Sequence, residues 1–342
     1  MVARGYPHMK KSLFAILLAA TVLAAPPAYK IVGKIKIGGA GRWDYSYSDS
    51  ANHRLYISHG TQTEVVDTAT DKLIGTIAGT TGVHGIAIAG DLGRGFTSDG
   101  QDNDVTIFDL KTLKVLSKVK TGQNPDSIIY EPVTHRIFTF NGRSSDSTVI
   151  DAKTGDVLTS SIPLGGKPEF AQVDGKGHIY VNIEDKNEIV EVDAKNSLVA
   201  KRYSIAPCDG PSGMAIDPKG RLYSVCENKV MIVSDPASGK VLANVPIGAG
   251  DDGVAFDDGY AFAANGADGT LTMVGETSPG KFEALATIPS QRLGRTIAAD
   301  QKAHKLYVPT AEFGPAPPPS PDGKKGRPPV LPDTFEILVF GR

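Results

Sequence analysis

Seven polar residues recur at equivalent places in a repeated sequence unit, and their side chains could bind or transform a ligand. They are spaced 40 to 43 residues apart and are Asp44, His84, Asp126, Glu169, Ser212, Asp252 and Arg295. Crowded carboxylates raise one another's pKa or recruit a cation. We therefore predict that this polar ring binds a small cationic ligand or a divalent metal ion, whose identity the sequence leaves open. A merely solvated rim is the alternative.

The register of the repeat defines these positions. In six units the first apolar run ends on an acidic residue, and Ala89 takes that place in the remaining unit; the acidic residues are Asp49, Glu131, Asp174, Asp217, Asp257 and Asp300. Counting back six residues from each run end gives unit starts near 43, 83, 125, 168, 211, 251 and 294, and the polar residue comes next. Two residues further on, most side chains are apolar, as in a buried layer.

Short strands must position these residues. A phrase of the type TEVVDTAT ends its apolar run at Asp67 and returns at steps of 42 residues, with Asp109, Asp151, Asp193 and Asp235 in the same place. Each unit holds four runs rich in β-branched and aromatic residues, separated by Gly, Pro, Asn and Asp. A period of 40 to 45 residues with four strands per unit is typical of a β-propeller blade. The chain is therefore predicted to be an all-β, seven-bladed propeller of four-stranded antiparallel blades.

The two ends of the chain are predicted to share the last blade. The seventh unit offers only three strands and ends in FEILVF, whereas the stretch YKIVGKIKIGG near the N-terminus has no partner strands before it. An N-terminal strand that joins the last blade closes the ring without an exposed sheet edge. Residues 28–342 then form one domain. We interpret the recurring Asp as a turn residue that accepts backbone N–H groups between the third and fourth strands.

In a propeller the loops that enter the innermost strands converge on one mouth of the central channel, so the polar ring should line that mouth.

The overall composition does not point to a particular class of partner. The chain has 342 residues, and 36 Lys and Arg nearly balance 38 Asp and Glu, for a formal charge of -2. The net charge is too small to create an electrostatic field that attracts a polyanion or an anionic membrane, so a local site must select the partner.

The first residues predict export. Lys10 and Lys11 precede a short apolar run from Leu13 to Leu23, and small residues follow it, which is the pattern of a signal peptide cleaved after Ala24. The run is too short to span a bilayer comfortably. We therefore predict a signal peptide at 1–24 and a periplasmic or secreted protein that does not span the membrane after cleavage.

The only two cysteines, Cys208 and Cys226, are predicted to belong to the same face of the fifth blade. In an oxidising compartment they could form a disulfide; two free thiols are the alternative.

A proline-rich loop at 312–333 separates the second and third strands of the last blade. Strand parity predicts that it emerges on the face of the polar ring, as a lid, a partner-docking arm or a disordered insertion. Lys324, Lys325 and Arg327 would bring positive charge to this mouth.

The repeats resemble the YVTN-type propeller family, which includes exported YncE-like proteins. The resemblance rests on the RLYxx strands, on the VxVxD-turn-TG pieces and on the Gly-x-x-Pro entries at Gly122–Pro125 and Gly165–Pro168, and it covers roughly residues 28–342. It implies the propeller fold, whereas the function stays open because such propellers serve as binding modules, subunits and enzymes.

Three functions are compatible with this fold, and a binding or scaffold module for an unknown protein partner or a small cationic ligand is the main prediction. The sequence lacks a nucleophile elbow, a zinc motif and a phosphate loop, which argues against an enzyme without excluding one. As an enzyme it would resemble propeller lactonases or lactonising enzymes, with His84 as base, Glu169 as acid and Arg295 as anchor.

The YncE resemblance suggests single-stranded nucleic-acid binding as the third function. Trp43, Tyr45 and Phe170 are candidate stacking residues at the rim, beside basic residues. The carboxylates of the ring would repel phosphates, so we expect nucleic acid to be an unlikely partner.

Overall fold

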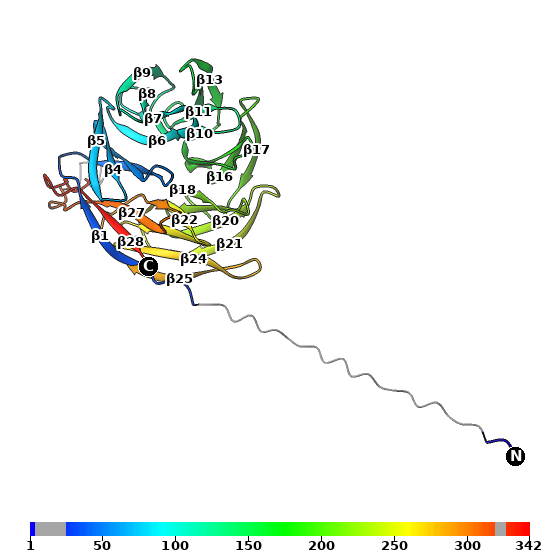
Figure 1. Cartoon of the computed structure of the whole chain (residues 1–342). Helices are drawn as coiled ribbons and strands as arrows, with labels where there is room; N and C mark the ends of the chain where they lie inside the picture. The colour runs from blue at the N-terminus through cyan, green and yellow to red at the C-terminus, as the bar shows by residue number, and fades with distance from the viewer. Residues whose placement is uncertain (4–24, 319–325) are drawn as a thin grey trace.

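The computed structural model describes residues 1–3, 25–318 and 326–342, so Lys324, Lys325 and nearly all of the predicted signal peptide lie outside the described residues. Seven four-stranded antiparallel sheets stand around a central axis (Figure 1). Besides strands, the described residues contain two single 3-10 turns, η1 (Gly90–Leu92) and η2 (Glu184–Lys186). The predicted all-β seven-bladed propeller is confirmed.

Each blade runs from the axis outwards. The innermost strands are β2 (Trp43–Asp49), β6 (Val83–Ala89), β10 (Pro125–Glu131), β14 (Pro168–Val173), β18 (Pro211–Ile216), β22 (Asp251–Asp257) and β26 (Ala298–Asp300). The second strands are β3 (Arg54–His59), β7 (Arg94–Asp99), β11 (Arg136–Asn141), β15 (His178–Ile183), β19 (Leu222–Cys226), β23 (Tyr260–Asn265) and β27 (Lys305–Thr310).

The third strands are β4 (Gln62–Asp67), β8 (Asp104–Asp109), β12 (Asp146–Asp151), β16 (Glu188–Asp193), β20 (Val230–Asp235), β24 (Thr270–Ser278) and β28 (Glu336–Gly341). The outermost strands are β5 (Lys72–Ala78), β9 (Val115–Lys120), β13 (Val157–Pro163), β17 (Leu198–Ser204), β21 (Lys240–Pro246), β25 (Lys281–Pro289) and β1 (Lys30–Lys36).

Six innermost strands begin at the residue that the repeat register predicts, but the seventh does not. It begins at Ala298 and not near Gly294. Leu293 and Thr296 have a left-handed backbone, with φ of 63° and 57°. A left-handed residue interrupts the extended conformation that a ladder requires. The last blade therefore enters the axis through an irregular segment that carries Arg295.

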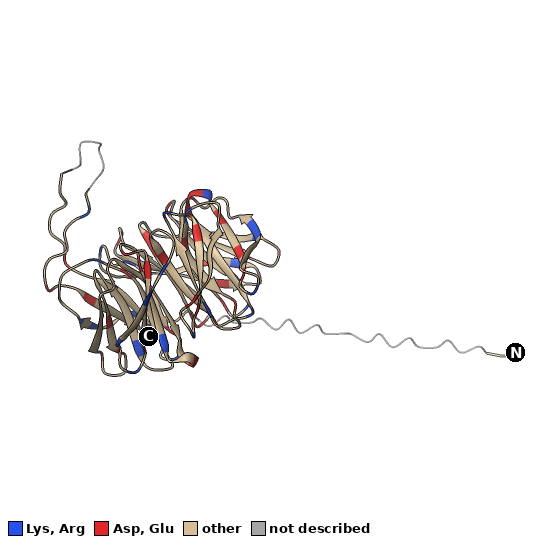
Figure 2. Cartoon of the chain, turned by 90° about the horizontal axis from the view of Figure 1, so that it is seen from above, with Lys and Arg blue, Asp and Glu red and all other residues tan. Residues whose placement is uncertain are grey.

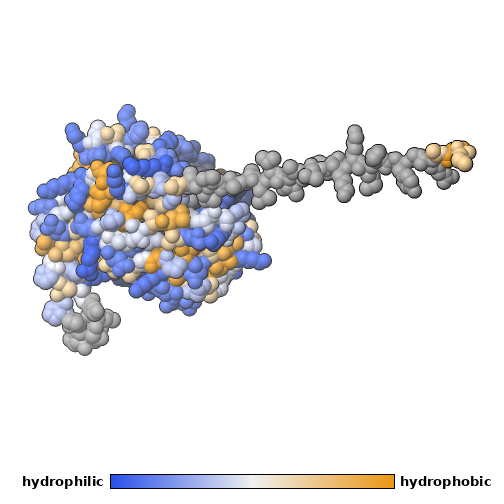
Figure 3. All heavy atoms as spheres, turned by 90° about the horizontal axis from the view of Figure 1, so that it is seen from below, coloured by the Kyte–Doolittle hydropathy of each residue, from blue (hydrophilic) through white to orange (hydrophobic). Residues whose placement is uncertain are grey.

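The core consists of the interfaces between neighbouring blades. Middle strands alternate their side chains between two flanking sheets, and their large apolar residues are fully buried, for example Tyr56, Phe96, Phe138 and Tyr307. The outermost strands are half exposed, and several carry exposed apolar side chains near their first residues, among them Leu116 and Leu158. In Figure 3 apolar atoms form separated patches between hydrophilic ones. Lys and Arg are interspersed with Asp and Glu over the blades (Figure 2).

The ring closes as predicted. β1 pairs antiparallel with β28, from Lys30 opposite Gly341 to Lys36 opposite Glu336, so the first and last strands lie side by side in one sheet (Figure 1). Ile35 of β1 is buried, and the hydroxyl of Tyr29, just before β1, donates to Asp257 of the sixth blade.

The recurring Asp acts as a turn residue in the structure. Asp151 Oδ1 accepts the backbone N–H groups of Lys153 and Thr154, both at 2.8 Å, and Asp67, Asp109 and Asp193 accept in the same pattern. The backbone donor at Thr154 is the main reason why the pKa of Asp151 is lowered. These carboxylates therefore stabilise the turns between the third and fourth strands, and we assign them no role in ligand binding or catalysis.

Cys208 and Cys226 form a disulfide that joins the loop entering β18 to the end of β19, with a sequence separation of 18. Cross-linking a loop of this length lowers the conformational entropy of the unfolded chain, which adds roughly 3 kcal/mol to the free energy of unfolding. We expect the double variant Cys208→Ser/Cys226→Ser to lose about that much free energy of unfolding, measured by urea titration.

Wild-type protein kept in a reductant is the matched control for that change, because it loses the bond and keeps the sulfur atoms. Equal urea midpoints for oxidised wild type, reduced wild type and the double variant would show that the cross-link contributes nothing.

Within the described part of the chain, no helix is long and apolar enough to cross a bilayer.

Candidate functional site

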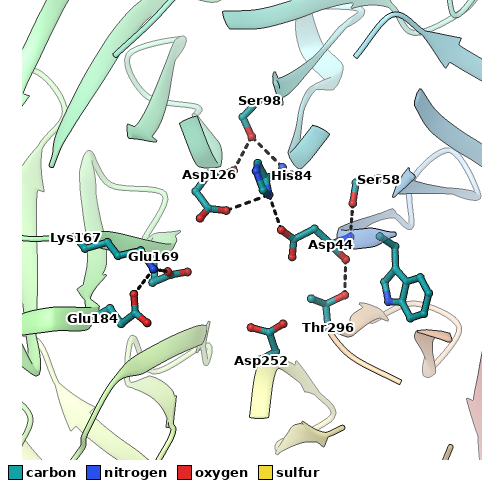
Figure 4. Close-up of polar contacts among 12 residues, drawn as sticks. Asp44, Ser58, His84, Ser98, Asp126, Lys167, Glu169, Glu184, Asp252 and Thr296 are labelled. Atoms are coloured by element: carbon teal, nitrogen blue, oxygen red, sulfur yellow. Dashed lines mark hydrogen bonds and ion pairs between the residues drawn. The ribbon is translucent and has the colours of Figure 1, made fainter. Parts of the chain in front are cut away.

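The polar ring lies at one mouth of the channel, on neighbouring inner strands. Its first six members are each the second residue of an innermost strand, and Arg295 lies just before β26. Figure 4 shows Asp44, His84, Asp126, Glu169 and Asp252 pointing into one central space. The ring is divided into three charged groups and one isolated hydroxyl.

A β-bulge aims the ring residues inwards. In each of the first six blades the pairing between the first two strands shifts just after the strand begins, for example between Val83 and Ile86 and between Asp251 and Val254. A bulge leaves residues outside the ladder and turns their side chains. The inner strands also approach closely here, because a Cβ on Gly253 would lie 2.8 Å from Thr296 Cα.

The first group, which we call the triad, consists of Asp44, His84 and Asp126 from three consecutive blades. His84 Nδ1 lies 2.6 Å from Asp44 Oδ2 and 3.5 Å from Asp126 Oδ1. One ligand atom from each residue can be chosen so that all three lie within 4.8 Å of one another. All three side chains are partly buried. The triad therefore offers one imidazole nitrogen and carboxylate oxygens around a single point.

Hydroxyl groups fix the backbone that carries the triad. The N–H of Asp44 donates to Ser58 Oγ at 2.7 Å, and Thr296 Oγ1 donates to the carbonyl oxygen of Asp44 at 2.7 Å. Ser98 Oγ accepts from the N–H of Gly85 and donates to the carbonyl oxygen of Asp126 at 2.6 Å. Ser98 thus links the second and third blades directly behind His84, which restricts how far the triad can spread.

The carboxylates of the triad favour a positive charge between them. Burial disfavours an imidazolium at His84, but the hydrogen bond to Asp44 and the charge of Asp126 outweigh it and raise the pKa of His84 to about 9. Burial, followed by the charge of Asp44, raises the pKa of Asp126 to about 6. At neutral pH a protonated His84 therefore lies between two carboxylates, in the place where a cation is favoured.

The second group pairs Asp252 with Arg295. Arg295 Nη1 lies 2.5 Å from Asp252 Oδ2, and Nη2 lies 3.5 Å from Asp44 Oδ1 and donates to the carbonyl oxygen of Trp43 at 3.0 Å. Burial opposes the charge of Arg295, but Asp252 and Asp44 raise its pKa. This guanidinium satisfies Asp252 and shares part of its charge with the triad.

The third group places Lys167 between two carboxylates. Lys167 Nζ lies 2.6 Å from Glu169 Oε1 and also contacts Glu184 of η2 (Figure 4). One ammonium cannot neutralise both carboxylates, and burial together with the charge of Asp126 raises the pKa of Glu169. Ser212 belongs to none of the groups, because its Oγ donates to the carbonyl oxygen of Asp251 at 3.3 Å.

The prediction of stacking aromatics at the rim is wrong for Trp43 and Tyr45. Trp43 is 5% exposed and stacks on Phe335, with ring centroids 5.0 Å apart. Tyr45 is buried too, and its ring packs edge-on against Phe170 at 5.0 Å. Trp43 packs between blades, in a cluster that includes Phe335 and Ile337. Tyr45 and Phe170 line the channel below the ring, where Tyr45 is too buried to stack on a base at the rim.

Two cavities adjoin the ring. The channel cavity, of about 350 Å³, is lined by inner strands of blades one to four, including Tyr45, Ile86, Ile128 and Phe170. The mouth cavity, of about 540 Å³, lies between blades five to seven and blade one, and the base of the proline-rich loop forms one wall through Phe313, Arg327 and Pro328. The loop therefore lies at the mouth that carries the ring.

Several residues of this site escaped the reasoning from sequence. Glu184 and Glu227 lie in loops that connect second to third strands, and these loops open at the same mouth as the entering loops. Strand parity would have found them, because a chain that enters at one mouth returns to it after two strands. The sequence indicates that Asp251 and Arg42 lie near the mouth, but their contacts and the pairing of Lys167 depend on the three-dimensional structure, which no spacing indicates.

No family model matches this chain, and no curated protein matches its sequence. Among solved structures it is similar to Kuenenia stuttgartiensis hydrazine synthase, with a TM-score of 0.70 and 15% sequence identity over 80% of this chain and 94% of that chain. At this identity the similarity shows a shared propeller fold and nothing about activity. The relation to the YVTN-type family stays a prediction.

Proposed function

We propose that this propeller is an exported binding module whose channel mouth binds a divalent metal ion at the triad of Asp44, His84 and Asp126. The observation that carries the proposal is the convergence of three potential ligand atoms, from three separate blades, within 4.8 Å of one another. The propeller fold supports a binding or scaffold role in general, and the disulfide is compatible with an oxidising compartment.

Charge pairing selects the triad from the rest of the ring. Asp252 has Arg295 and Glu169 has Lys167 as ion-pair partners. Among the described residues, Asp126 has no Lys or Arg nitrogen within 4.0 Å, and its recorded charged neighbour is His84 at 3.5 Å. The electrostatic stabilisation of an added cation is therefore largest beside Asp126.

The donor set favours a transition metal over the other cations. One imidazole nitrogen with carboxylate oxygens suits Zn²⁺ or Mn²⁺, because such a metal ion can displace the proton of His84, whereas Ca²⁺ prefers six to eight oxygen ligands. A polyamine does not displace that proton and would place its ammonium beside a protonated His84. We therefore rank Zn²⁺ and Mn²⁺ ahead of Ca²⁺ and spermidine.

Titration calorimetry with metal-free protein tests this proposal, with Zn²⁺, Mn²⁺, Ca²⁺ and spermidine as probes. We expect Asp126→Asn to weaken binding of the preferred metal by roughly 100-fold or more, since even outer-shell changes cost 10- to 100-fold. Glu184→Gln is the matched control: it removes a carboxylate of the same mouth that contacts Lys167 and no residue of the triad, and the affinity of this variant should stay within about threefold of wild type.

Two results would refute the metal site. One is the absence of binding heat for every probe at millimolar concentration. The other is an equal loss of affinity in Asp126→Asn and Glu184→Gln, which would indicate a diffuse acidic field and no specific set of ligands.

The alternative functions find less support in the geometry. His84, Glu169 and Arg295 are each held by a different partner, and a His84 with a pKa of about 9 is already protonated at neutral pH, so it is poorly suited as a base. Lys167 and Arg295 are occupied by ring carboxylates, which leaves them less able to bind phosphates. A lactone-hydrolysis screen with a His84→Ala control would still detect an enzyme.

A further inference from the structure

The mouth cavity carries opposite charges at its two ends. Glu227 of blade five and Asp251 of blade six line one end, whereas Arg42 of blade one and Arg327 of the proline-rich loop line the other. The ion pair of Asp252 with Arg295 lies in the blades between them. Apolar surface from Leu293 and Phe313 contributes to the walls. The order of the blades around the axis thus separates the acidic end from the basic end.

The basic end lacks an anion. Arg42 Nη2 donates to the carbonyl oxygen of Pro328 at 2.7 Å, and in the described part of the chain no carboxylate lies within 4.0 Å of the Arg42 guanidinium. Burial, followed by the charges of Arg327 and Arg295, lowers the pKa of Arg42. Because its charged neighbours carry the same sign, a carboxylate placed here would gain from two guanidinium groups at once. Guanidinium groups bind carboxylates with paired hydrogen bonds.

The acidic end lacks a cation. Asp251 is 8% exposed; the amide of Asn265, in the orientation that its neighbours favour, donates to Oδ1, whereas Oδ2 has no hydrogen-bond partner among the described residues. A buried carboxylate oxygen without a partner is costly and calls for an explanation. Glu227, at the same end, has no Lys, Arg or His nitrogen within 4.0 Å over the described ranges. An ammonium group at this end of the cavity would gain from the negative charge of both carboxylates.

We propose that the mouth cavity binds a small zwitterion of dipeptide size, with its carboxylate at Arg42 and Arg327 and its ammonium group at Asp251 and Glu227. A simple anion would meet the carboxylates of blades five and six, and a simple cation would meet the three arginines. A ligand with both charges complements both ends. The volume of about 540 Å³ lies within the usual range for small-molecule sites. This site is distinct from the triad and does not depend on a metal.

Calorimetry with three forms of one dipeptide tests the inference. The probes are Ala-Phe with both termini free, N-acetyl-Ala-Phe, which keeps only the carboxylate, and Ala-Phe amide, which keeps only the ammonium. We expect the free dipeptide to bind about tenfold more tightly than either blocked form, because each charge-assisted contact contributes a factor of this size. Ala-Ala and Ala-Leu are measured in parallel, so that the test does not depend on whether the Phe side chain fits the cavity.

The variant Arg42→Gln tests whether the carboxylate of the dipeptide binds at Arg42. We expect Arg42→Gln to weaken the free dipeptide by about tenfold and to leave the affinity of the amide unchanged. Arg143→Gln is the matched control, since Arg143 is an exposed arginine in a loop between second and third strands of blade three and does not line the cavity. Asp126→Asn should keep full dipeptide affinity, which separates this site from the metal site.

The inference is overturned if none of the three free dipeptides binds at millimolar concentration, or if blocking a terminus does not change the affinity. It is also overturned if Arg42→Gln, shown by its thermal midpoint to be folded, binds Ala-Phe as tightly as wild type.

Discussion

A chain that begins at Gly38 is expected to lose cooperative folding. This truncation removes β1 (Lys30–Lys36) and exposes the edge of β28, where Ile337, Leu338 and Phe340 are buried in the intact protein. It also removes Ile35 and Tyr29 from two inter-blade clusters. Losing one buried large side chain costs about 2 to 5 kcal/mol, so the total loss should exceed roughly 5 kcal/mol, comparable with the whole stability of a typical domain. Urea unfolding followed by circular dichroism measures it.

Two controls make that prediction specific. A chain beginning at Ala25 lacks only the predicted signal peptide and should unfold like the longer chain. A synthetic peptide of residues 25–38, added to the chain that begins at Gly38, should bind the free edge of β28 and restore a cooperative transition. If the truncated chain has the urea midpoint and slope of the longer chain, ring closure by β1 is dispensable.

Asp99→Asn is expected to stabilise the protein above neutral pH. Asp99, at the end of β7, is fully buried, and its carboxylate accepts from Thr97 Oγ1 at 2.8 Å and from Thr106 Oγ1. Burial raises its pKa to about 7, from an ordinary value of 3.8. Equivalent places at the ends of β11 and β23 carry neutral amides, Asn141 and Asn265. Lys118 Nζ lies 3.5 Å from Asp99 Oδ2 and favours the charged carboxylate, but burial outweighs it, so a neutral group suits this place better.

The direction of the pH effect follows from proton binding. Between pH 4 and pH 7 the folded protein holds a proton on Asp99 that the unfolded chain has released, so the wild type loses stability as the pH rises through this range. Asn carries no charge at any pH, and the gain of the variant should therefore grow from near zero at pH 4 to a plateau above pH 7. We expect a plateau on the order of 2 kcal/mol, with roughly 4 kcal/mol as the ceiling set by the change in pKa.

Urea titrations from pH 4 to pH 9 check this prediction. Thr97→Val is a useful companion variant, because it removes one of the hydroxyl groups that hold the carboxylate and should lower stability at every pH. A difference between Asp99→Asn and wild type that is independent of pH would show that Asp99 is not protonated in the folded state.

Much of the candidate site follows from the register of the repeat. The second residue of each inner strand faces the channel mouth in six blades, and counting back from the end of each apolar run, an acid in six units and Ala89 in the other, finds this position for Asp44, His84 and Asp126. Repetition makes the inference possible, because equivalent residues in equivalent blades must point the same way. The seventh blade shows the limit: the left-handed residues Leu293 and Thr296 displace the start of β26, and no repeat pattern indicates them.

The amino-acid sequence alone determined the number of blades, the four strands of each and the closure by β1, since a twisted four-stranded sheet buries its faces only against copies of itself. It also determined which residues approach the axis. Only the tertiary structure decided which charges pair, how Phe335 buries Trp43, and how Arg42, Asp251 and Glu227 come to line one cavity. Those contacts join segments up to about 290 residues apart, and they depend on side-chain positions across blades, which local sequence patterns do not encode.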